Sequence, residues 1–417
     1  MNCSVNCTWL DFDAERSIHG QVLAQASTLS SQQYGYDKAG RLKLVKDTTK
    51  AGSCTTRSYS FDNNSNRTAL VTRPPKAGGA CDETSSGSTQ AYSYDKADRL
   101  LGSGIAYDDY GRIISLPAAF AGGSTLTTSY FDNDMVRSQI QNGVTNTYDL
   151  DAAMRPRQRV QTGGSGATEV FHYTGGSDAP TWTQRGSAWT RNIGGIGGEL
   201  AAIQDSATGT NLQLTDLHGD IVATASLSLT ATGPTATFEF DEFGNPKQAG
   251  SPRFGWLGGK HRRTELPSGV IQMGVRSYAP AIGRFISVDP VRGGSANAYD
   301  YVNQDPLNNF DLGGCEAEPV RSCVVSCVRS HCGGHHYAKV QHCLATWQSW
   351  KSIVGCVGKF CDTLPVIRCI SKCRTKKPPR IPKPPKGGGK VPSPTPEIVG
   401  GPVIPPLPIP IPIPIPL

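Results

Sequence analysis

The sequence predicts a mainly β protein built from repeated antiparallel β-hairpins, followed by a small α-helical, cysteine-rich module and a disordered proline-rich tail. Three observations lead to this fold class. A short tyrosine–aspartate phrase recurs along the front of the chain, 47 glycines and 30 prolines interrupt the 417 residues, and cysteines gather near the end. Only 18% of the residues are charged and 37% are hydrophobic, too few of either for a helical bundle or a membrane protein.

The recurring phrase begins at Tyr34 and predicts the hairpins. It reads Tyr-Gly-Tyr-Asp-Lys-Ala-Gly-Arg-Leu over residues 34–42, returns as Tyr-Ser-Tyr-Asp-Lys-Ala-Asp-Arg-Leu over 92–100, and recurs at 107–113. Aromatic residues two positions apart lie on one face of a strand. The Asp that follows bonds backbone amides ahead of it and Gly accepts a positive φ, so the phrase ends in a turn. Each copy is therefore a hairpin of roughly 20 residues that must stack on its neighbours.

This phrase is similar to the YD repeat of bacterial Rhs proteins. Residues 215–246 resemble the run that leads into the Rhs-associated core, and residues 273–290 and 297–311 resemble the signature of that core. The resemblance covers roughly residues 30–314. It divides this part of the chain as follows: an N-terminal segment (1–33), a YD-repeat region (34–253) and a core (254–314).

In this family a long β-sheet ribbon spirals into a hollow shell around a variable C-terminal toxin. The core closes the shell and cuts the toxin free inside it. The resemblance therefore implies a spiralling sheet that forms part of a shell. Because a full shell takes more repeats than this chain contains, the chain is either the last windings of a larger ancestor or the partner of another shell segment.

The resemblance also implies an autoproteolytic site at Asp289 and Asp311, which are separated by 22 positions. Rhs cores are cleaved shortly after the second aspartate, which here falls near Gly314 and Cys315. Two nearby carboxylates suit this chemistry, because both cannot ionise cheaply and one acts as acid while the other acts as base. This sequence has Leu312 where the family usually has proline, and one extra residue in the first motif. The alternative is that the two aspartates only begin turns.

Residues 315–375 hold nine of the 13 cysteines, a density typical of disulfide scaffolds. Cysteines four positions apart lie on one helix face, so bridges between two antiparallel helices would fit two of these pairs. We expect disulfides among Cys323, Cys327, Cys332, Cys343, Cys356, Cys361, Cys369 and Cys373. The alternative is a zinc site, although the spacing fits no usual template; its ligands would come from His331, Cys332, His335, His336, His342 and Cys343. No other cofactor is expected.

A further pair, Cys54 and Cys81, lies in the repeat region among glycine and proline. This setting predicts a disulfide that closes a surface loop, and the alternative is two buried free thiols. Disulfides favour an oxidising compartment, so we expect a secreted or cell-surface protein. The opening residues lack the basic and apolar regions of a signal peptide. The chain is therefore either N-terminally truncated or exported by another route.

Charge and proline define the end of the chain. Residues 315–417 hold 14 Lys/Arg and 4 Asp/Glu, and residues 376–417 hold 16 of the prolines. A basic segment suits contact with nucleic acid, anionic lipid or an acidic partner, or simple solvation. Alternating Ile-Pro forms neither helix nor sheet ladder, so we expect an extended or disordered tail and no transmembrane helix.

Taken together, these features predict an Rhs-type carrier that presents a variable C-terminal effector for intercellular competition. The implied partners are an immunity protein and a further shell segment or secretion-system component. No motif of a known nuclease, deaminase or protease follows Gly314. The alternatives are a non-enzymatic secreted or surface protein whose YD repeats bind carbohydrate or a protein, or a degenerate remnant without activity.

Overall fold

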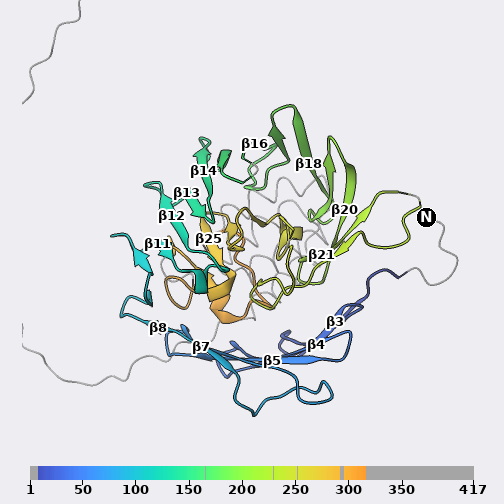
Figure 1. The fold of residues 1–417 in the computed structure, drawn as a ribbon, viewed down its shortest axis with the longest axis vertical. Coiled ribbons are helices and arrows are strands. Elements are labelled where there is room, and N and C mark those ends of the chain that lie inside the picture. Colours follow the sequence, from blue (N-terminus) through green and yellow to red (C-terminus); the bar gives the residue numbers. More distant parts are fainter. Residues whose placement is uncertain (1–7, 165, 229, 251, 292–294, 316–417) are drawn as a thin grey trace, which may run out of the picture.

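The computed structural model describes residues 8–164, 166–228, 230–250, 252–291 and 295–315. In this part of the chain, two large antiparallel sheets curve around a small central sheet (Figure 1). The architecture is mainly β, as predicted, and the large sheets do not close into a barrel. The predicted helical module and proline-rich tail lie outside the described residues. No helix in the described part of the chain has the length and apolar character needed to cross a membrane.

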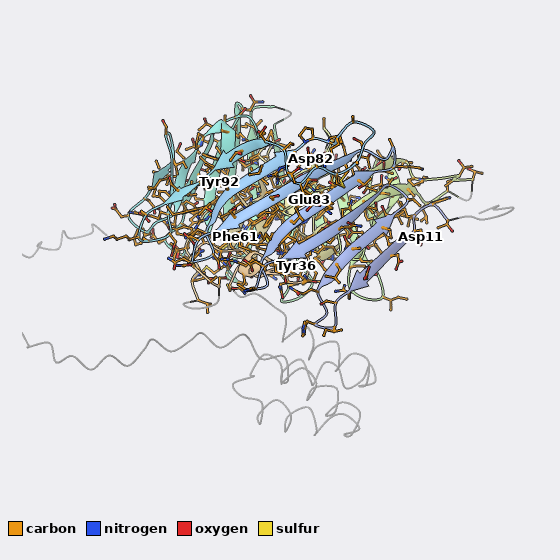
Figure 2. All side chains as sticks on the ribbon, turned by 90° about the horizontal axis from the view of Figure 1, so that it is seen from below. Asp11, Tyr36, Phe61, Asp82, Glu83 and Tyr92 are labelled. Carbon is orange, nitrogen blue, oxygen red and sulfur yellow. A yellow bond between two sulfur atoms is a disulfide. The ribbon has the colours of Figure 1, made fainter. Side chains whose placement is uncertain are left out.

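The first large sheet is a meander of seven strands in sequence order. Seen from below, the strands run side by side across one face of the molecule, from Asp11 near one edge to Tyr92 near the other (Figure 2). The strands are β1 (Phe12–Arg16), β2 (Val22–Ser27), β3 (Ser30–Tyr36), β4 (Leu42–Thr49), β5 (Cys54–Phe61), β6 (Arg67–Arg73) and β7 (Ser88–Ala91).

A short hairpin, β8 (Ser93–Tyr94) and β9 (Leu100–Leu101), leads to the second large sheet, a meander of thirteen strands. These strands arch over the side of the centre opposite the first sheet (Figure 1). They are β10 (Ala106–Tyr107), β11 (Ile113–Leu116), β12 (Leu126–Tyr130), β13 (Val136–Gln141), β14 (Val144–Leu150), β15 (Pro156–Thr162), β16 (Ala167–His172), β17 (Trp182–Arg185), β18 (Ala188–Gly194), β19 (Leu200–Asp205), β20 (Gly209–Thr215), β21 (Ile221–Ser226) and β22 (Ala236–Thr237). The helical turn η1 (Ala118–Phe120) links two of them.

The repeated phrase forms the turns that the sequence predicts. In the first copy, Asp37 Oδ1 accepts the backbone N–H groups of Ala39 and Arg41 at 2.8 and 3.0 Å, and Gly40 has a φ of +86°. Arg41 Nε also donates to Asp37 Oδ2 at 2.7 Å, so the arginine of the phrase closes the turn. Three more copies repeat this arginine–aspartate pair: Arg99–Asp95, Arg112–Asp108 and Arg155–Asp151.

A tyrosine hydroxyl ties five of the hairpins to the structure before them. Tyr36 donates to the carbonyl of Val22 at 2.7 Å, and Tyr94 to the carbonyl of Arg67 at 2.8 Å. The same type of bond joins Tyr107 to Leu100, Tyr130 to Ile113 and Tyr173 to Pro156. A buried hydroxyl needs such a partner. The repeat therefore stacks through its aromatic residues, as expected of hairpins that cannot bury one face alone.

The predicted core segment fills the space between the two large sheets (Figure 1). It holds a four-stranded antiparallel sheet and three helical turns. Its buried aromatic cluster includes Trp256, Tyr278, Phe285 and Tyr301, each at most 3% exposed. The elements are η2 (Gly258–Lys260), β23 (Arg263–Thr264), β24 (Ile271–Met273), β25 (Arg276–Ala279), η3 (Pro280–Ile282), β26 (Arg284–Phe285) and η4 (Val302–Gln304).

Ion pairs attach the core and the segment just before it to both sheets. Glu265 pairs with Arg159 of β15, and Arg253 pairs with Glu169 of β16 at 2.8 Å. On the opposite side, Arg57 of β5 pairs with Glu242 at 2.8 Å. Removing one partner of such a buried pair strands the other charge in an apolar interior, which costs several kcal/mol. The core and the sheets are thus one folded unit, and its interior positions the groups considered next.

Candidate active site

A buried arginine organises the two aspartates that the sequence singles out. Arg276 begins β25 and is 1% exposed. Its guanidinium stacks on the Phe285 ring, with Cζ 3.6 Å from the ring centroid. Its Nη2 atom lies 3.0 Å from Asp289 Oδ2 and 3.0 Å from Asp311 Oδ2. Because both carboxylates contact one nitrogen atom, they are neighbours in space despite their separation along the chain.

Each aspartate has further contacts that fix its orientation. Asp289 follows β26, and its backbone N–H donates to the carbonyl of Ala298 at 2.8 Å. Its Oδ1 accepts the backbone N–H of Val291 at 2.8 Å. The Asp311 side chain is 1% exposed, and its Oδ1 accepts the backbone N–H of Cys315 at 3.0 Å. The predicted pair therefore meets in one buried cluster, and one member also begins a turn, as the alternative reading supposed.

The predicted cleavage position, Gly314–Cys315, lies beside this cluster. Gly314 has a φ of +68°, and a Cβ there would lie 2.4 Å from the Met273 carbonyl oxygen. Gly274, across from it, also has a positive φ of +55°, and its Cβ would lie 2.1 Å from the Gly313 carbonyl oxygen. Only glycine fits these two positions. The backbone of residues 313–315 is thus held closely against the turn between β24 and β25.

The departure at Leu312 has a structural role. Its side chain packs against the aromatic cluster of the core, and its carbonyl accepts a hydrogen bond from Arg262 Nη1 at 3.1 Å. Arg262 is held in turn by Asp178, whose two oxygens lie 2.6 and 2.8 Å from the guanidinium. Leucine therefore anchors the segment between Asp311 and Gly314 without the ring of a proline.

The charges in the cluster suit acid–base chemistry. Burial lowers the pKa of Arg276 below its usual value, and the opposing effect of Asp289 and Asp311 does not offset it. One buried arginine thus faces two carboxyl groups, a charge imbalance typical of paired-carboxylate sites. Asp311 already contacts the amide nitrogen of Cys315. Asp289 shares the arginine and is 5% exposed. The arrangement places one carboxyl group at the Cys315 amide and a second one on the same arginine, the two groups that general acid–base catalysis requires.

Arg276 is a site residue that was not predicted from the sequence. The signal was present, since an arginine stands in the run Gln-Met-Gly-Val-Arg-Ser-Tyr-Ala that forms β24 and β25. Arginine is rarely buried unless it is paired. A buried arginine in a core strand indicates carboxylate partners elsewhere in the chain, but nothing local says which ones.

A second polar cluster lines a cavity of about 80 Å³ between the first sheet and β20–β21. His218 Nδ1 lies 2.8 Å from Asp220 Oδ1, and Nε2 lies 2.9 Å from the carbonyl oxygen of Pro306. Burial lowers the pKa of His218, but the carboxylates of Asp220 and Asp216 outweigh it and raise the pKa to about 9. Burial and Asp220 raise the pKa of Asp216 to about 7. This histidine joins the repeat region to the core, and we assign it no chemistry.

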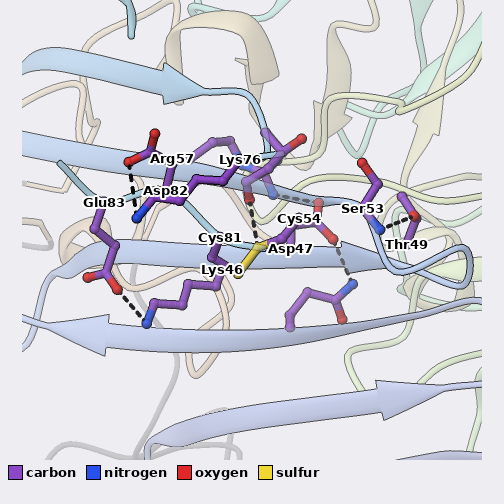
Figure 3. The surroundings of a disulfide bond; sticks show 12 residues. Lys46, Asp47, Thr49, Ser53, Cys54, Arg57, Lys76, Cys81, Asp82 and Glu83 are labelled. Atoms are coloured by element: carbon purple, nitrogen blue, oxygen red, sulfur yellow. Dashed lines mark hydrogen bonds and ion pairs between the residues drawn. A yellow bond between two sulfur atoms is a disulfide. The ribbon is translucent and has the colours of Figure 1, made fainter. Parts of the chain in front are cut away.

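The predicted Cys54–Cys81 disulfide is present in the structure (Figure 3). Cys54 begins β5 and is 1% exposed, and Cys81 lies in the loop between β6 and β7. Ion pairs flank the bond: Lys46 with Glu83 at 2.6 Å and Lys76 with Asp82 at 4.0 Å (Figure 3). The disulfide therefore closes a surface loop between two strands of the first sheet.

The remaining predicted site residues lie outside the described residues. They are Cys323, Cys327, Cys332, Cys343, Cys356, Cys361, Cys369 and Cys373 for disulfides, and His331, Cys332, His335, His336, His342 and Cys343 for the zinc alternative. Within the part that the structure describes, no group of three or more His, Cys, Asp or Glu side chains could hold a metal ion. Cys315 is partly exposed, and its Sγ donates to the Gly313 carbonyl oxygen at 3.6 Å.

Comparison with known proteins relates the fold to Tc toxin complexes. No protein-family model and no curated protein sequence matches the chain. The crystal structures of TcdB2-TccC3-Cdc42 and of TcdB2-TccC3 without its hypervariable C-terminal region each match with a TM-score of 0.56 at 14% sequence identity. The structure of the Photorhabdus luminescens Tc holotoxin pore with a mutation in TccC3 gives the same values.

The fold is that of a segment of these Tc toxin chains. The matches cover 73 to 74% of this chain but 17% of the matched chains. This chain therefore spans well under two thirds of their length. At 14% identity the likeness establishes the fold, and function has to be argued from the site.

Proposed function

We propose that this chain is an Rhs-type carrier, a segment of a β-sheet shell whose core cleaves the chain between Gly314 and Cys315. One observation carries the proposal. Arg276 Nη2 contacts both Asp289 and Asp311, and Asp311 in turn accepts the backbone N–H at the proposed cleavage site. Two aspartates that only began turns would not need to share a buried arginine, whose desolvation costs several kcal/mol.

In the proposed reaction, ionised Asp289 takes a proton from a water molecule as the water oxygen attacks the Gly314 carbonyl carbon. Protonated Asp311 gives its proton to the Cys315 nitrogen, and the C–N bond breaks. The products are a carboxyl group on Gly314 and a free amino group on Cys315. Arg276 stabilises the negative charge as it moves between the aspartates and the carbonyl oxygen. The close backbone contacts at Gly274 and Gly314 keep the Gly314–Cys315 peptide bond in position during this step.

Intact-mass measurement of the freshly purified chain tests the cleavage. The sample stays near neutral pH, because Asp-Pro bonds break in acid. We expect a break at Gly314–Cys315 in the wild type and an unbroken chain in Asp289→Asn and in Asp311→Asn. Asp305→Asn is the matched control, since Asp305 is a buried core aspartate that bonds Asn308 and Asn309 rather than Arg276. A wild-type chain that stays whole after prolonged incubation sinks the proposal.

The carrier part of the proposal assigns the residues after Gly314 to an effector. Support comes from the Tc toxin fold and from the basic, cysteine-rich composition of residues 315–417. Because the matched chains are much longer, we propose a further shell segment or secretion-system component as partner, and an immunity protein for the effector. The Cys54–Cys81 disulfide supports a secreted or surface location. A growth assay tests the effector role. Production of the wild-type chain should inhibit bacterial growth, and production of Asp289→Asn should not.

A second candidate function is a non-enzymatic protein that binds carbohydrate or a protein partner. One observation favours it. His172 of β16 stacks on Trp182 of β17 with ring centroids 3.6 Å apart and planes within 2°. The neighbouring Phe171 side chain contacts core residue Arg263, so the stacked pair faces away from the core. An unbroken chain that binds a glycan array through Trp182, with loss of binding in Trp182→Ala, would favour this function.

A further inference from the structure

A small cavity separates the turn between β5 and β6 from the core. It measures about 10 Å³. On the sheet side it is lined by the turn that ends β5, and on the core side by the segment from η3 to η4. Its polar lining residues are Ser65, Asn66, Arg67, Tyr94, Arg284, Asn297, Asp300 and Gln304. Its residues come from parts of the chain more than 200 positions apart.

Four of these side chains carry polar atoms without a hydrogen-bond partner in the described part of the protein. They are Nε and Nη2 of Arg67, Nη1 of Arg284, Oδ1 of Asn66 and Oε1 of Gln304. All four side chains belong to residues that are 3 to 4% exposed. A buried polar group without a partner costs about 1 to 3 kcal/mol. Such groups are rare in folded proteins, so four around one small cavity require an explanation.

The two amide groups cannot rotate to remove the problem. Asn66 Nδ2 donates to Asp62 Oδ2 at 3.0 Å and to Asp98 Oδ1 at 2.7 Å. Gln304 Nε2 donates to Asp300 Oδ1 at 2.6 Å. Exchanging nitrogen and oxygen would set an amide oxygen against a carboxylate oxygen in each case. The orientations of both amide groups are therefore fixed, and their oxygens are the acceptors that have no partner among the described residues.

The two arginines supply the donors and are equally fixed. Arg67 Cζ lies 4.0 Å from the centroid of the Phe243 ring, and Arg284 Cζ lies 4.8 Å from that of Tyr299. Arg284 Nη2 also donates to the Asp98 carbonyl at 2.7 Å. Stacking holds the guanidinium planes. Among the described residues, Nε and Nη2 of Arg67 and Nη1 of Arg284 have no hydrogen-bond acceptor.

Backbone strain on the core side indicates that surrounding contacts maintain the conformation of this turn. Val302, Asn303 and Gln304 have φ values of +47°, +57° and +58°. Three successive residues other than glycine in the left-handed region are costly, above all a β-branched valine. Such strain persists only where the surroundings over-determine it. Here it belongs to the turn that carries the Gln304 amide.

We propose that one ordered water molecule binds in this cavity and links the first sheet to the core. The water accepts hydrogen bonds from Arg67 and Arg284 and donates to Asn66 and Gln304. Water is the species that matches two donors and two acceptors. An anion would face two amide oxygens, and a cation would face two guanidinium groups. A space of about 10 Å³ is close to the least that one water molecule needs.

The linked elements are those that carry part of the candidate active site. The core segment between Arg284 and Gln304 includes Asp289. A direct bond, from Asn297 Nδ2 to the carbonyl of Asn64 at 2.9 Å, joins the same two elements beside the cavity. Buried waters with three or four partners are part of the structure and are costly to remove. This water would hold the Asp289 segment against the first sheet whether or not the chain is cleaved.

A crystal structure of the full chain at a resolution that places waters tests the proposal. We expect one density peak within 2.7–3.2 Å of at least three of the four side chains, the usual hydrogen-bond range. A second crystal grown in sodium bromide serves as the anion probe. A bromide anomalous peak in the cavity would overturn the water and establish an anion site. A cavity without density would also overturn the proposal.

Two variants test whether the water density peak depends on the Gln304 amide oxygen. Gln304→Met removes the amide oxygen at similar side-chain length, and we expect the peak to be lost. Gln139→Met is the matched control, because Gln139 is a buried glutamine (4% exposed) on β13 that does not line this cavity. That variant should keep the peak. A peak retained in Gln304→Met contradicts the four-partner arrangement. If Gln304→Met does not fold, the wild-type and bromide crystals still decide.

Discussion

Asp311 accepts the backbone N–H of Cys315 at 3.0 Å through one oxygen and contacts Arg276 at 3.0 Å through the other. A single carboxylate thus connects the buried arginine to the peptide nitrogen at the proposed cleavage site. Asp289 reaches the same arginine from a different part of the core. The arrangement makes the arginine as important to the site as either aspartate, which leads to a first prediction.

Arg276→Lys should slow cleavage by about 100-fold, the usual cost of losing one well-placed donor. Lysine keeps the charge, but it lacks the planar guanidinium whose stacking on the Phe285 ring holds Nη2 between the two carboxylates. Arg276→Met should instead destabilise the fold by about 3 to 5 kcal/mol, since it leaves two buried carboxylates without a cation. Time-resolved intact mass and urea denaturation measure the two effects. If Arg276→Lys is cleaved at the wild-type rate, the guanidinium of Arg276 has no role in the mechanism.

Two adjacent glycines allow a matched test of backbone position. Gly314→Ala should slow cleavage by about 100-fold, as displacements near 1 Å do, because its φ is +68° and a Cβ would lie 2.4 Å from the Met273 carbonyl. Gly313→Ala should cleave normally, since a Cβ there meets nothing within 4 Å. Intact mass over time compares the two. Equal rates in both variants would mean that this contact does not position the bond.

The turns of the repeats could be predicted because their contacts are local. Asp37, Gly40 and Arg41 lie within five positions, and the hydrogen bonds that close the turn join residues two and four apart. Alternating aromatic residues likewise follow from the period of a strand. The division into two large sheets at β8 and β9 could not be predicted. It depends on how the whole ribbon bends around the core, and no local pattern marks it.

The candidate site could be predicted only in part. Asp289 and Asp311 stood out through their resemblance to a family signature, but Arg276 meets them only because β24 and β25 fold back beside both. The proposed water site is more remote still. Asn66 and Gln304 have ordinary sequence surroundings, and only the packed structure leaves Oδ1 of one and Oε1 of the other without a partner.

The disulfide offers a stability prediction that does not depend on function. Cys54 and Cys81 are separated by 27 positions, so the bond should contribute about 3 to 4 kcal/mol by restricting the unfolded chain. In urea denaturation under oxidising conditions, the double variant Cys54→Ser/Cys81→Ser should have a free energy of unfolding that is lower by this amount. Under reducing conditions the variant and the wild type should unfold at nearly the same urea concentration. A large difference that persists in reductant would place the effect in the folded state instead.

A pH prediction rests on His218, which joins β20–β21 to the core through Asp220 and the Pro306 carbonyl. The carbonyl oxygen only accepts, so Nε2 carries a proton, and Asp220 favours a second proton on Nδ1. The pKa of His218 rises to about 9 in the folded protein, despite burial, which lowers it. Because the unfolded value is about 6.5, the folded state holds the proton more tightly between these limits.

Stability should therefore fall as pH rises from about 6.5 to about 9, by at most about 3 kcal/mol from this residue. The contribution is complete below the unfolded pKa and disappears above the folded one. The raised pKa of Asp216, about 7, acts in the same direction at lower pH. Urea denaturation at a series of pH values measures the slope, and His218→Asn should flatten it above pH 7. If wild type and His218→Asn lose stability in parallel up to pH 9, His218 is not the group that titrates.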